Sequence, residues 1–279
     1  MMSAAVIITT YNRPDALRAA LAALASQTTP PAEVIVADDG SQSDTQSVVQ
    51  EVRSLMPSKL LHVWHPDEGF RAAAIRNLAV AASTSDYLIF IDGDCIARPN
   101  FVANHLRFAE SGWFVAGHRI LLNREMTTEC LTKQLPVHLK NWPFWLWQFS
   151  ASRINRISPM ITLPNASWRK LHPSRWEGAR TCNLAIWRSD FLNVNGFDEK
   201  YAGWGHEDAD LAVRLINSGI ERKDGRFGTG VFHLWHEESD RAQTDANLAR
   251  LQSVQSSQQT LAEVGLSRYD GEMVRAALR

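Results

Sequence analysis

The stretch YLIFIDGD, residues 87–94, decides the fold class of this chain. Its apolar first part predicts a strand covered on both faces, as in a parallel sheet between two layers of helices. Asp92 and Asp94 follow at the carboxyl end of the strand, the end that faces the ligand-binding crevice of α/β sheets. Carboxylate oxygens suit Mg²⁺ and Mn²⁺, and Gly93 leaves room for a bulky anion. A solvated Asp-Gly turn is the alternative, and these residues alone do not decide between the two.

The same strand–turn–helix construction is repeated in the amino-terminal third. Residues 5–9 and 34–37 are apolar runs, and each is followed by a polar turn. Helical spacing follows both turns, with Leu17, Leu21 and Leu24 in the first predicted helix and Val48, Val49, Val52 and Leu55 in the second. A strand over 60–64 and an alanine-rich helix over 72–82 then lead to the stretch above. Alternating strands and helices predict βαβ units and a parallel sheet, so Asp39 and Asp92 are expected at one sheet edge.

Several motifs together resemble the family 2 glycosyltransferases of the GT-A fold. They are VIITTYNRP (6–14), VIVADDGS (34–41), Arg76-Asn77 and Asp92-Gly93-Asp94. A further motif, GWGHEDADL (203–211), resembles the acceptor-side motif of β-1,4-galactosyltransferases and chondroitin-polymerase-like enzymes. The motifs occur in the expected order from about residue 5 to residue 240. The resemblance implies an α/β fold with a Rossmann-like, mixed but mostly parallel sheet, helices on both faces and an acceptor-side subdomain.

The resemblance also implies a binding site for a UDP-sugar donor. The residues that it places around the nucleotide are Thr10, Tyr11 and Arg13 beside the base and ribose, Asp39 on the uracil or ribose, Arg76 near the base or diphosphate, and Asp92 near the ribose. Asp94 is implied to bind the Mn²⁺ or Mg²⁺ that bridges the diphosphate. Such a cation stabilises the charge that develops on the leaving nucleotide. Solvated roles for Arg76 and Arg13, and a packed role for Tyr11, stay open.

The second constellation, in the GWGHEDADL motif, is predicted to supply the base. Glu207 and Asp208 open a helix whose apolar face includes Leu211 and Leu215, and acids in a first helical turn can serve only to complement the helix dipole. The functional interpretation makes Asp208 the general base for an acceptor hydroxyl, with inversion in a single displacement. Glu207 then positions the acceptor or the sugar. Trp204, between two glycines, suits stacking on a sugar ring, or else packs in the core.

Two histidines follow a predicted strand that begins near residue 230. His233 and His236 would lie on opposite faces if the strand continued through both, so they need not share a ligand. In related enzymes a residue of this segment completes the metal sphere. We expect His236 rather than His233 to do so, because it lies farther past the strand.

Composition limits the classes of function. The 279 residues fit one large α/β domain, and a net charge of −1 gives no general attraction to nucleic acid. Cys95, Cys130 and Cys182 show no paired spacing, which predicts reduced thiols in a cytoplasmic protein. Met1-Met2-Ser3 leads directly into the first strand with no recognisable signal peptide, and no apolar run reaches the roughly 20 residues of a membrane span.

We divide the chain into a nucleotide-sugar half (1–120), an acceptor and catalytic half (121–240) and a helical tail (241–279). The second half contains a Trp-rich insertion over 123–177, with Trp142, Trp145 and Trp147 close to basic residues. Interfacial tryptophans beside cations suit the inner face of a plasma membrane. Packing on the sheet, or a groove for a glycan, is the alternative.

The sequence therefore predicts an inverting glycosyltransferase that moves a hexose or N-acetylhexosamine from a UDP-sugar to a saccharide hydroxyl. The expected acceptor is a saccharide or lipid-linked saccharide of a bacterial surface polysaccharide or lipopolysaccharide. A nucleotidyltransferase is the first alternative, although residues 9–13 lack the glycine-rich loop that it needs. A non-catalytic glycan- or nucleotide-binding protein is the second, and the presence of both Asp94 and Asp208 speaks against it.

Overall fold

The computed structural model describes residues 2–237 and 243–279. The strands are β1 Ala4–Thr10, β2 Glu33–Asp38, β3 Lys59–Trp64, β4 Tyr87–Asp92, β5 Cys95–Ala97, β6 Trp113–Ala116, β7 Arg119–Leu121, β8 Leu184–Trp187, β9 Glu221–Asp224 and β10 Val231–His233. The α-helices are α1 Pro14–Ala25, α2 Ser43–Arg53, α3 Ala72–Ala81, α4 Phe101–Phe108, α5 Arg124–Thr132, α6 Trp142–Ser150, α7 Arg188–Asn193, α8 Glu207–Asn217, α9 Thr244–Ser257 and α10 Gly271–Ala277.

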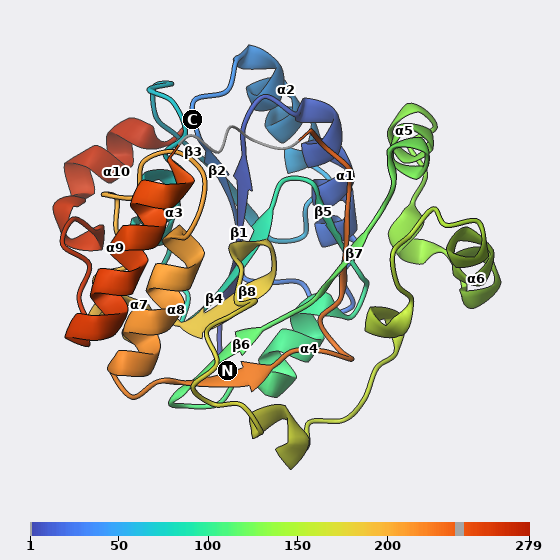
Figure 1. Ribbon diagram of the computed structural model, residues 1–279. Coiled ribbons are helices and arrows are strands. Elements are labelled where there is room, and N and C mark those ends of the chain that lie inside the picture. Colours follow the sequence, from blue (N-terminus) through green and yellow to red (C-terminus); the bar gives the residue numbers. More distant parts are fainter. Residues whose placement is uncertain (1, 238–242) are drawn as a thin grey trace.

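A seven-stranded sheet with the order β3-β2-β1-β4-β8-β6-β9 forms the centre of the molecule (Figure 1). Strands β3, β2, β1 and β4 are parallel, and β8 runs antiparallel to both of its neighbours. On β4, Ile89 and Ile91 pack with α1, α2 and α4 on one face of the sheet, whereas Leu88 and Phe90 pack with α3, α7 and α8 on the other. This arrangement confirms the predicted mixed, mostly parallel sheet with helices on both faces.

The second helix ends earlier than the sequence pattern predicts. Val48, Val49 and Val52 are buried on α2 as expected, but α2 ends at Arg53 and Leu55 is 71% exposed. Leu55 therefore lies outside the helix in which its spacing had placed it.

A second, three-stranded sheet with the order β5-β10-β7 brings the carboxyl-terminal part of the chain to the Asp-Gly-Asp motif. β5 begins directly after Asp94, and β10 pairs with it antiparallel, so that His233 lies opposite Cys95. Two segments more than a hundred residues apart in sequence therefore meet at the end of β4.

The Trp-rich insertion forms α5 and α6, which stand away from the main sheet beside β7 (Figure 1). Trp145 is buried and stacks on Phe232 of β10, with ring centroids 4.1 Å apart. Of the two alternatives for these tryptophans, packing holds for Trp145, which belongs to the core between α6 and the small sheet. Among the described residues, no helix is long and apolar enough to cross a bilayer.

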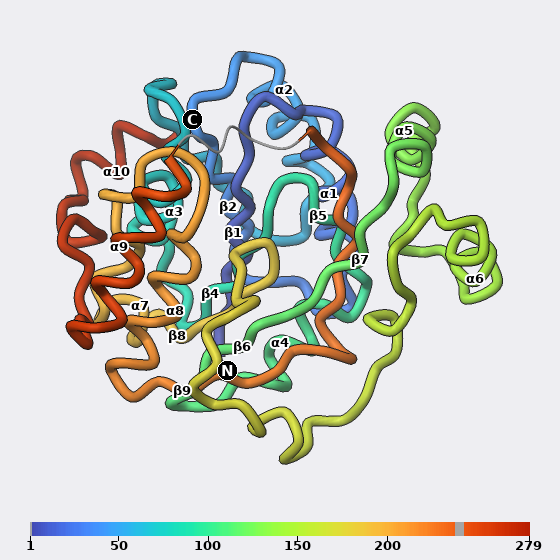
Figure 2. Tube along the Cα trace, in the orientation of Figure 1, coloured from blue at the N-terminus to red at the C-terminus, as the bar shows by residue number. Residues whose placement is uncertain are grey.

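The segment after β10 returns to the amino-terminal half of the molecule. Val213 of α8 packs against Leu251 and Val254 of α9, and α10 contacts α3 and β3. The guanidinium group of Arg279 lies 3.3 Å from the ring centroid of Trp64, and the trace in Figure 2 ends beside β3. The predicted start of the tail near residue 241 lies outside the described residues.

Candidate active site

The predicted acidic edge forms where β1, β2 and β4 end side by side. Thr9 is in register with Asp92, and Thr10 is in register with Asp38. The backbone N–H of Gly93 donates to the Thr9 carbonyl oxygen at 2.6 Å. A Cβ atom on residue 93 would lie only 3.0 Å from the Thr9 carbonyl oxygen and the Thr10 side chain, so this tight crossing favours glycine.

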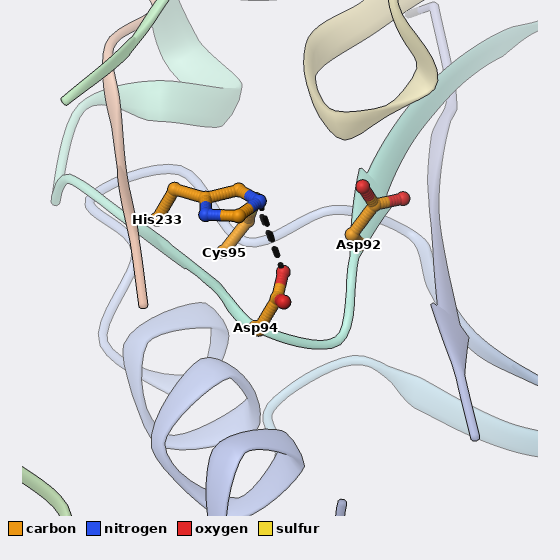
Figure 3. Close-up of side chains that lie close together, drawn as sticks. All are labelled: Asp92, Asp94, Cys95 and His233. Atoms are coloured by element: carbon orange, nitrogen blue, oxygen red, sulfur yellow. Dashed lines mark hydrogen bonds and ion pairs between the residues drawn. The ribbon is translucent and has the colours of Figure 1, made fainter. Parts of the chain in front are cut away.

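Asp94 lies at the centre of a cluster of cationic and imidazole side chains. The Nε2 atoms of His233 and His236 lie 3.6 and 3.5 Å from its two carboxylate oxygens, and Arg13 Nη1 lies 3.5 Å from one of them. Both histidines reach Asp94 because β10 ends at His233, so strand alternation does not place His236 on the opposite face. Figure 3 shows the His233 ring turned toward Asp94, with Asp92 at the tip of β4.

This cluster fits a divalent cation. One potential ligand atom from each of Asp92, Asp94, Cys95 and His233 lies within 4.8 Å of the others. Two ligands of one octahedral cation lie about 3 Å apart when each is about 2.1 Å from the ion, which is near the spacing of Asp94 and the imidazoles. Burial lowers the pKa of His233 and so favours the neutral imidazole that binds metals. Burial raises the pKa of the Cys95 thiol well above its ordinary value, so sulfur is the weakest candidate of the four.

The predicted donor-binding residues line the neighbouring strand ends. The buried Thr10 hydroxyl oxygen has no hydrogen-bond partner among the described residues, which leaves it available to a ligand. The Tyr11 hydroxyl donates to Asp67 at 2.9 Å, and half of the Tyr11 side chain is exposed. Asp39 is buried, and its oxygens accept from the Arg71 N–H at 2.9 Å and lie 2.6 Å from His65 Nε2.

His65 is a site residue that the sequence analysis missed. It follows β3, the strand next to β2, and so reaches the same edge of the sheet as Asp39. Asp39 was selected because it follows a parallel strand of the sheet, and the same criterion applies to His65. Its ring holds the Asp39 carboxylate in place, which leaves the carboxylate oxygens with free lone pairs that can still accept from a nucleotide.

Arg76 connects the two halves of the site. The side chain is buried, and its guanidinium nitrogens lie 3.2 Å from Glu207, 3.4 Å from Asp92 and 3.8 Å from Asp208. Burial raises the pKa of Asp92 to about 6, and the charges of Asp94 and Asp208 add to this against the opposing effect of Arg76. Through these charges, Asp92 is coupled to Asp94 on one side and to Asp208 of α8 on the other.

Asp208 is held by a residue that no sequence motif had indicated. Its carboxylate accepts hydrogen bonds from the backbone N–H and the side-chain hydroxyl of Thr181, both at 3.1 Å. Thr181 lies just before β8 and is buried, while the Asp208 side chain keeps 22% of its surface exposed. The carboxylate is thus fixed in position and remains accessible to a substrate.

The other acids of the same motif have different surroundings. Asp210 is fully buried and binds the Tyr201 hydroxyl and Arg214, so its role is in the packing of α8. Trp204, between Gly203 and Gly205 with φ of +70° and +112°, is 40% exposed and precedes the helix. An exposed ring there suits a sugar face, and this role for Trp204 stays a prediction.

Glu207 makes the stability of the fold dependent on pH. Burial raises its pKa to about 7, the charge of Asp208 adds to the rise, and Arg76 opposes it. The folded protein therefore keeps the proton to higher pH than the unfolded chain, in which the pKa has its ordinary value of 4.5. We expect the free energy of unfolding to fall as pH rises from about 4.5 to 7, by up to about 3 kcal/mol from this residue.

Urea unfolding in EDTA at several pH values between 5 and 8 tests this expectation. The Glu207→Gln variant keeps the shape of the side chain without the titration, so its stability should fall less over this range than that of the wild type. Equal slopes in the two proteins would show that Glu207 does not titrate in this window.

Comparisons with known proteins identify the family and the fold. Residues 5–166 match the family model described as glycosyl transferase family 2, and residues 165–237 match the one described as the N-terminal domain of galactosyltransferase. Validoxylamine A glucosyltransferase of Streptomyces hygroscopicus subsp. limoneus is 30% identical over 239 residues, which cover 81% of this chain and 50% of that protein. Chondroitin synthase of Escherichia coli is 26% identical over 77% of this chain and 32% of its own length. The chain thus spans half or less of these two relatives.

Solved structures show the same fold at low sequence identity. S. aureus TarS 1–349 in complex with UDP-GlcNAc matches with a TM-score of 0.62 and 14% identity, over 96% of this chain and 69% of that one. The mannosyltransferase PcManGT from Pyrobaculum calidifontis, in complex with GDP-Man and Mn²⁺, matches with a TM-score of 0.53 and 16% identity, over 82% and 56% of the two chains. With a family model matched over more than half of its length, on a GT-A fold that brings the family's acidic motifs to one edge of the sheet, the chain belongs to glycosyl transferase family 2.

Proposed function

We propose that this chain is an inverting glycosyltransferase that moves a hexose or N-acetylhexosamine from a UDP-sugar to a saccharide hydroxyl. The observation that carries the proposal is the pair of separate acidic sites. Asp94 lies among two imidazoles on one side, Asp208 is held by Thr181 on the other, and Arg76 with Asp92 lies between them. With the donor diphosphate at the first site and the acceptor hydroxyl at the second, the hydroxyl would attack one face of the anomeric carbon while the bond to UDP breaks on the opposite face.

Each site has a defined part in the proposed reaction. Asp94 would hold a Mn²⁺ or Mg²⁺ ion, with His236 or His233 and Asp92 as further candidate ligands, and the ion would supply Lewis-acid stabilisation of the departing UDP. The base and ribose are contacted by Thr10, Tyr11, Arg13 and Asp39. Asp208 accepts the proton of the acceptor hydroxyl, and Glu207 and Trp204 position the acceptor or the sugar. Residues 1–120 then bind most of the donor, and residues 121–240 supply the base, the acceptor site and the candidate histidine ligands of the cation.

The place of the reaction is part of the proposal. The described cysteines are free and buried, which supports a reducing compartment such as the cytoplasm. We propose action at the inner face of the plasma membrane on a growing surface polysaccharide or lipopolysaccharide. The bacterial chondroitin synthases among the relatives support a polysaccharide acceptor. Membership of glycosyl transferase family 2 favours this function over a nucleotidyltransferase or a non-catalytic binding protein.

A panel of nucleotide sugars tests the donor. Each UDP- and GDP-sugar is incubated with the chain and Mn²⁺ or EDTA, and nucleotide release is measured. We expect Mn²⁺-dependent release of UDP from at least one UDP-hexose or UDP-N-acetylhexosamine. Release of GDP alone would overturn the UDP assignment, and a product that retains the anomeric configuration of the donor by NMR would overturn inversion.

A further inference from the structure

Helix α6 has the reverse of the pattern expected for a helix on a protein surface. Over Trp142–Ser150, its polar side chains are Gln148 and Ser150. Gln148 lies on the buried face beside Trp145. A set of large apolar side chains faces outward, which we call the α6 ridge: Leu139 just before the helix, Trp142, Leu146, Trp147 and Phe149, each between 44% and 59% exposed. A helix that is apolar all round is typical of a protein core or of a lipid environment.

The fold holds the α6 ridge in a defined position. Trp145 stacks on Phe232 with an angle of 11° between the rings. The Gln148 side-chain oxygen accepts a 3.0 Å hydrogen bond from the buried Arg153, and Asn141 caps the first turn through the Phe144 N–H. The outward direction of the ridge is thus set by core contacts on the opposite face of the helix.

The segment that carries the ridge is basic. Residues 123–157 contain five Lys or Arg and two Glu with no Asp, a net charge of +3, whereas the whole chain has a net charge of −1. Arg124, Lys133 and Arg156 are exposed, and Lys140 lies over the Phe144 ring at the start of the helix. This charge complements the anionic lipids of a cytoplasmic leaflet, where each Lys or Arg near the surface contributes about 1 kcal/mol to binding.

We propose that the α6 ridge docks this protein on an anionic bilayer, with Trp142 and Trp147 at the level of the headgroups and Leu146 and Phe149 at the boundary of the acyl chains. Phe232, under α6, is followed on β10 by His233, which faces Asp94 from the other side of the small sheet. A bilayer bound to the ridge would therefore lie at a fixed distance and orientation from the Asp94 cluster. That docking brings the site close to a lipid-linked acceptor rests on the proposed function, whereas the docking itself does not.

Two other occupants fit the ridge less well. A glycan site needs hydrogen-bond donors and acceptors beside its aromatic rings. The cavity beside Trp142 has such groups, among them Asn100, Asn141 and Thr162, but Leu146, Trp147 and Phe149 lie outside it. A second copy of the chain, seated ridge to ridge, would bring two segments of net charge +3 together, which is unfavourable.

Vesicle sedimentation of the full chain tests the proposal. Vesicles of phosphatidylcholine alone are compared with vesicles that contain 30% phosphatidylglycerol. We expect the wild type to sediment with the anionic vesicles and to be released by 0.5 M NaCl, since salt screens surface charge. The double variant Leu146→Ser/Trp147→Ser should bind them at least about tenfold more weakly, because it loses buried apolar area.

The double variant Leu55→Ser/Leu261→Ser is the matched control. It removes side chains of similar exposure, 71% and 54%, far from α6, and it should bind the vesicles as the wild type does. Equal binding by the ridge variant and the control, or no binding by the wild type, would overturn docking through the ridge. A wild-type dimer in light scattering that the ridge variant converts to a monomer would overturn it in favour of a second copy. These outcomes need no donor sugar, so they are independent of the transferase proposal.

Discussion

Replacement of Asp208 by asparagine is expected to lower turnover by a factor of about 10² to 10⁴, the usual cost of removing a general base. The N–H and the hydroxyl of Thr181 bind the two carboxylate oxygens of Asp208, each at 3.1 Å. Asparagine has the same size, and its one oxygen can still accept from the Thr181 N–H while its NH₂ group donates to the hydroxyl oxygen. It cannot accept the proton of an acceptor hydroxyl. Turnover at saturating donor and acceptor is the measurement, with the donor found in the nucleotide-sugar panel.

Donor binding and the neighbouring acid serve as controls for Asp208. Calorimetry of UDP with Mn²⁺ should give the same affinity in Asp208→Asn as in the wild type, since Asp39 and Asp94 belong to other strand ends. Glu207→Gln should reduce turnover less, as expected of a positioning residue. If Asp208→Asn retains more than about a tenth of wild-type turnover, Asp208 is not the base and Glu207 is the next candidate.

Asp94→Asn is expected to abolish the coupling between Mn²⁺ and UDP and to lower transfer at least about 100-fold. Loss of groups that only support a metal ligand already costs about 10- to 100-fold, and Asp94 is proposed as a ligand itself. The variant should stay folded, because Asp94 lies between β4 and β5 and its side chain is not part of an apolar cluster. The measurement is UDP affinity by calorimetry with and without Mn²⁺.

Cys95→Ala is the matched control in the same cluster. Burial keeps the Cys95 thiol protonated, so its removal should leave the Mn²⁺ effect on UDP affinity unchanged. His236→Ala should weaken that effect by less than Asp94→Asn does, and no change at all would point to His233 or water as the further ligand. An unchanged Mn²⁺ effect in Asp94→Asn would disprove the metal assignment.

The fold and the acidic edge followed from local patterns of the sequence. Runs such as 5–9, 34–37 and 87–91 must be covered on both faces, and strands of this kind that alternate with helices form a parallel sheet. The carboxyl ends of parallel strands lie at one edge, so the placement of Asp39 and Asp92 followed without any knowledge of side-chain contacts. These predictions succeeded because they depend only on periodicity and chain direction.

Contacts across long sequence separations could not be predicted in the same way. Thr181 binds Asp208 because β8 inserts antiparallel between β4 and β6, and no short motif encodes that insertion. His233 and His236 both reach Asp94 because β10 ends between them. Strand alternation fails at the residue where the strand stops, and sequence patterns place such ends poorly.

The sequence by itself determined a parallel sheet, one acidic edge and a pair of motifs for donor and acceptor, since each follows from residue type and spacing. Only the tertiary structure decided which side chains are buried and which partner each one has. Trp145 and Trp147 are two positions apart on one helix, yet the first is buried against Phe232 and the second is 59% exposed. Glu207 and Asp208 are adjacent acids, yet one is buried beside Arg76 and the other remains accessible. Burial depends on what the rest of the chain places against a residue, and that is a property of the whole fold.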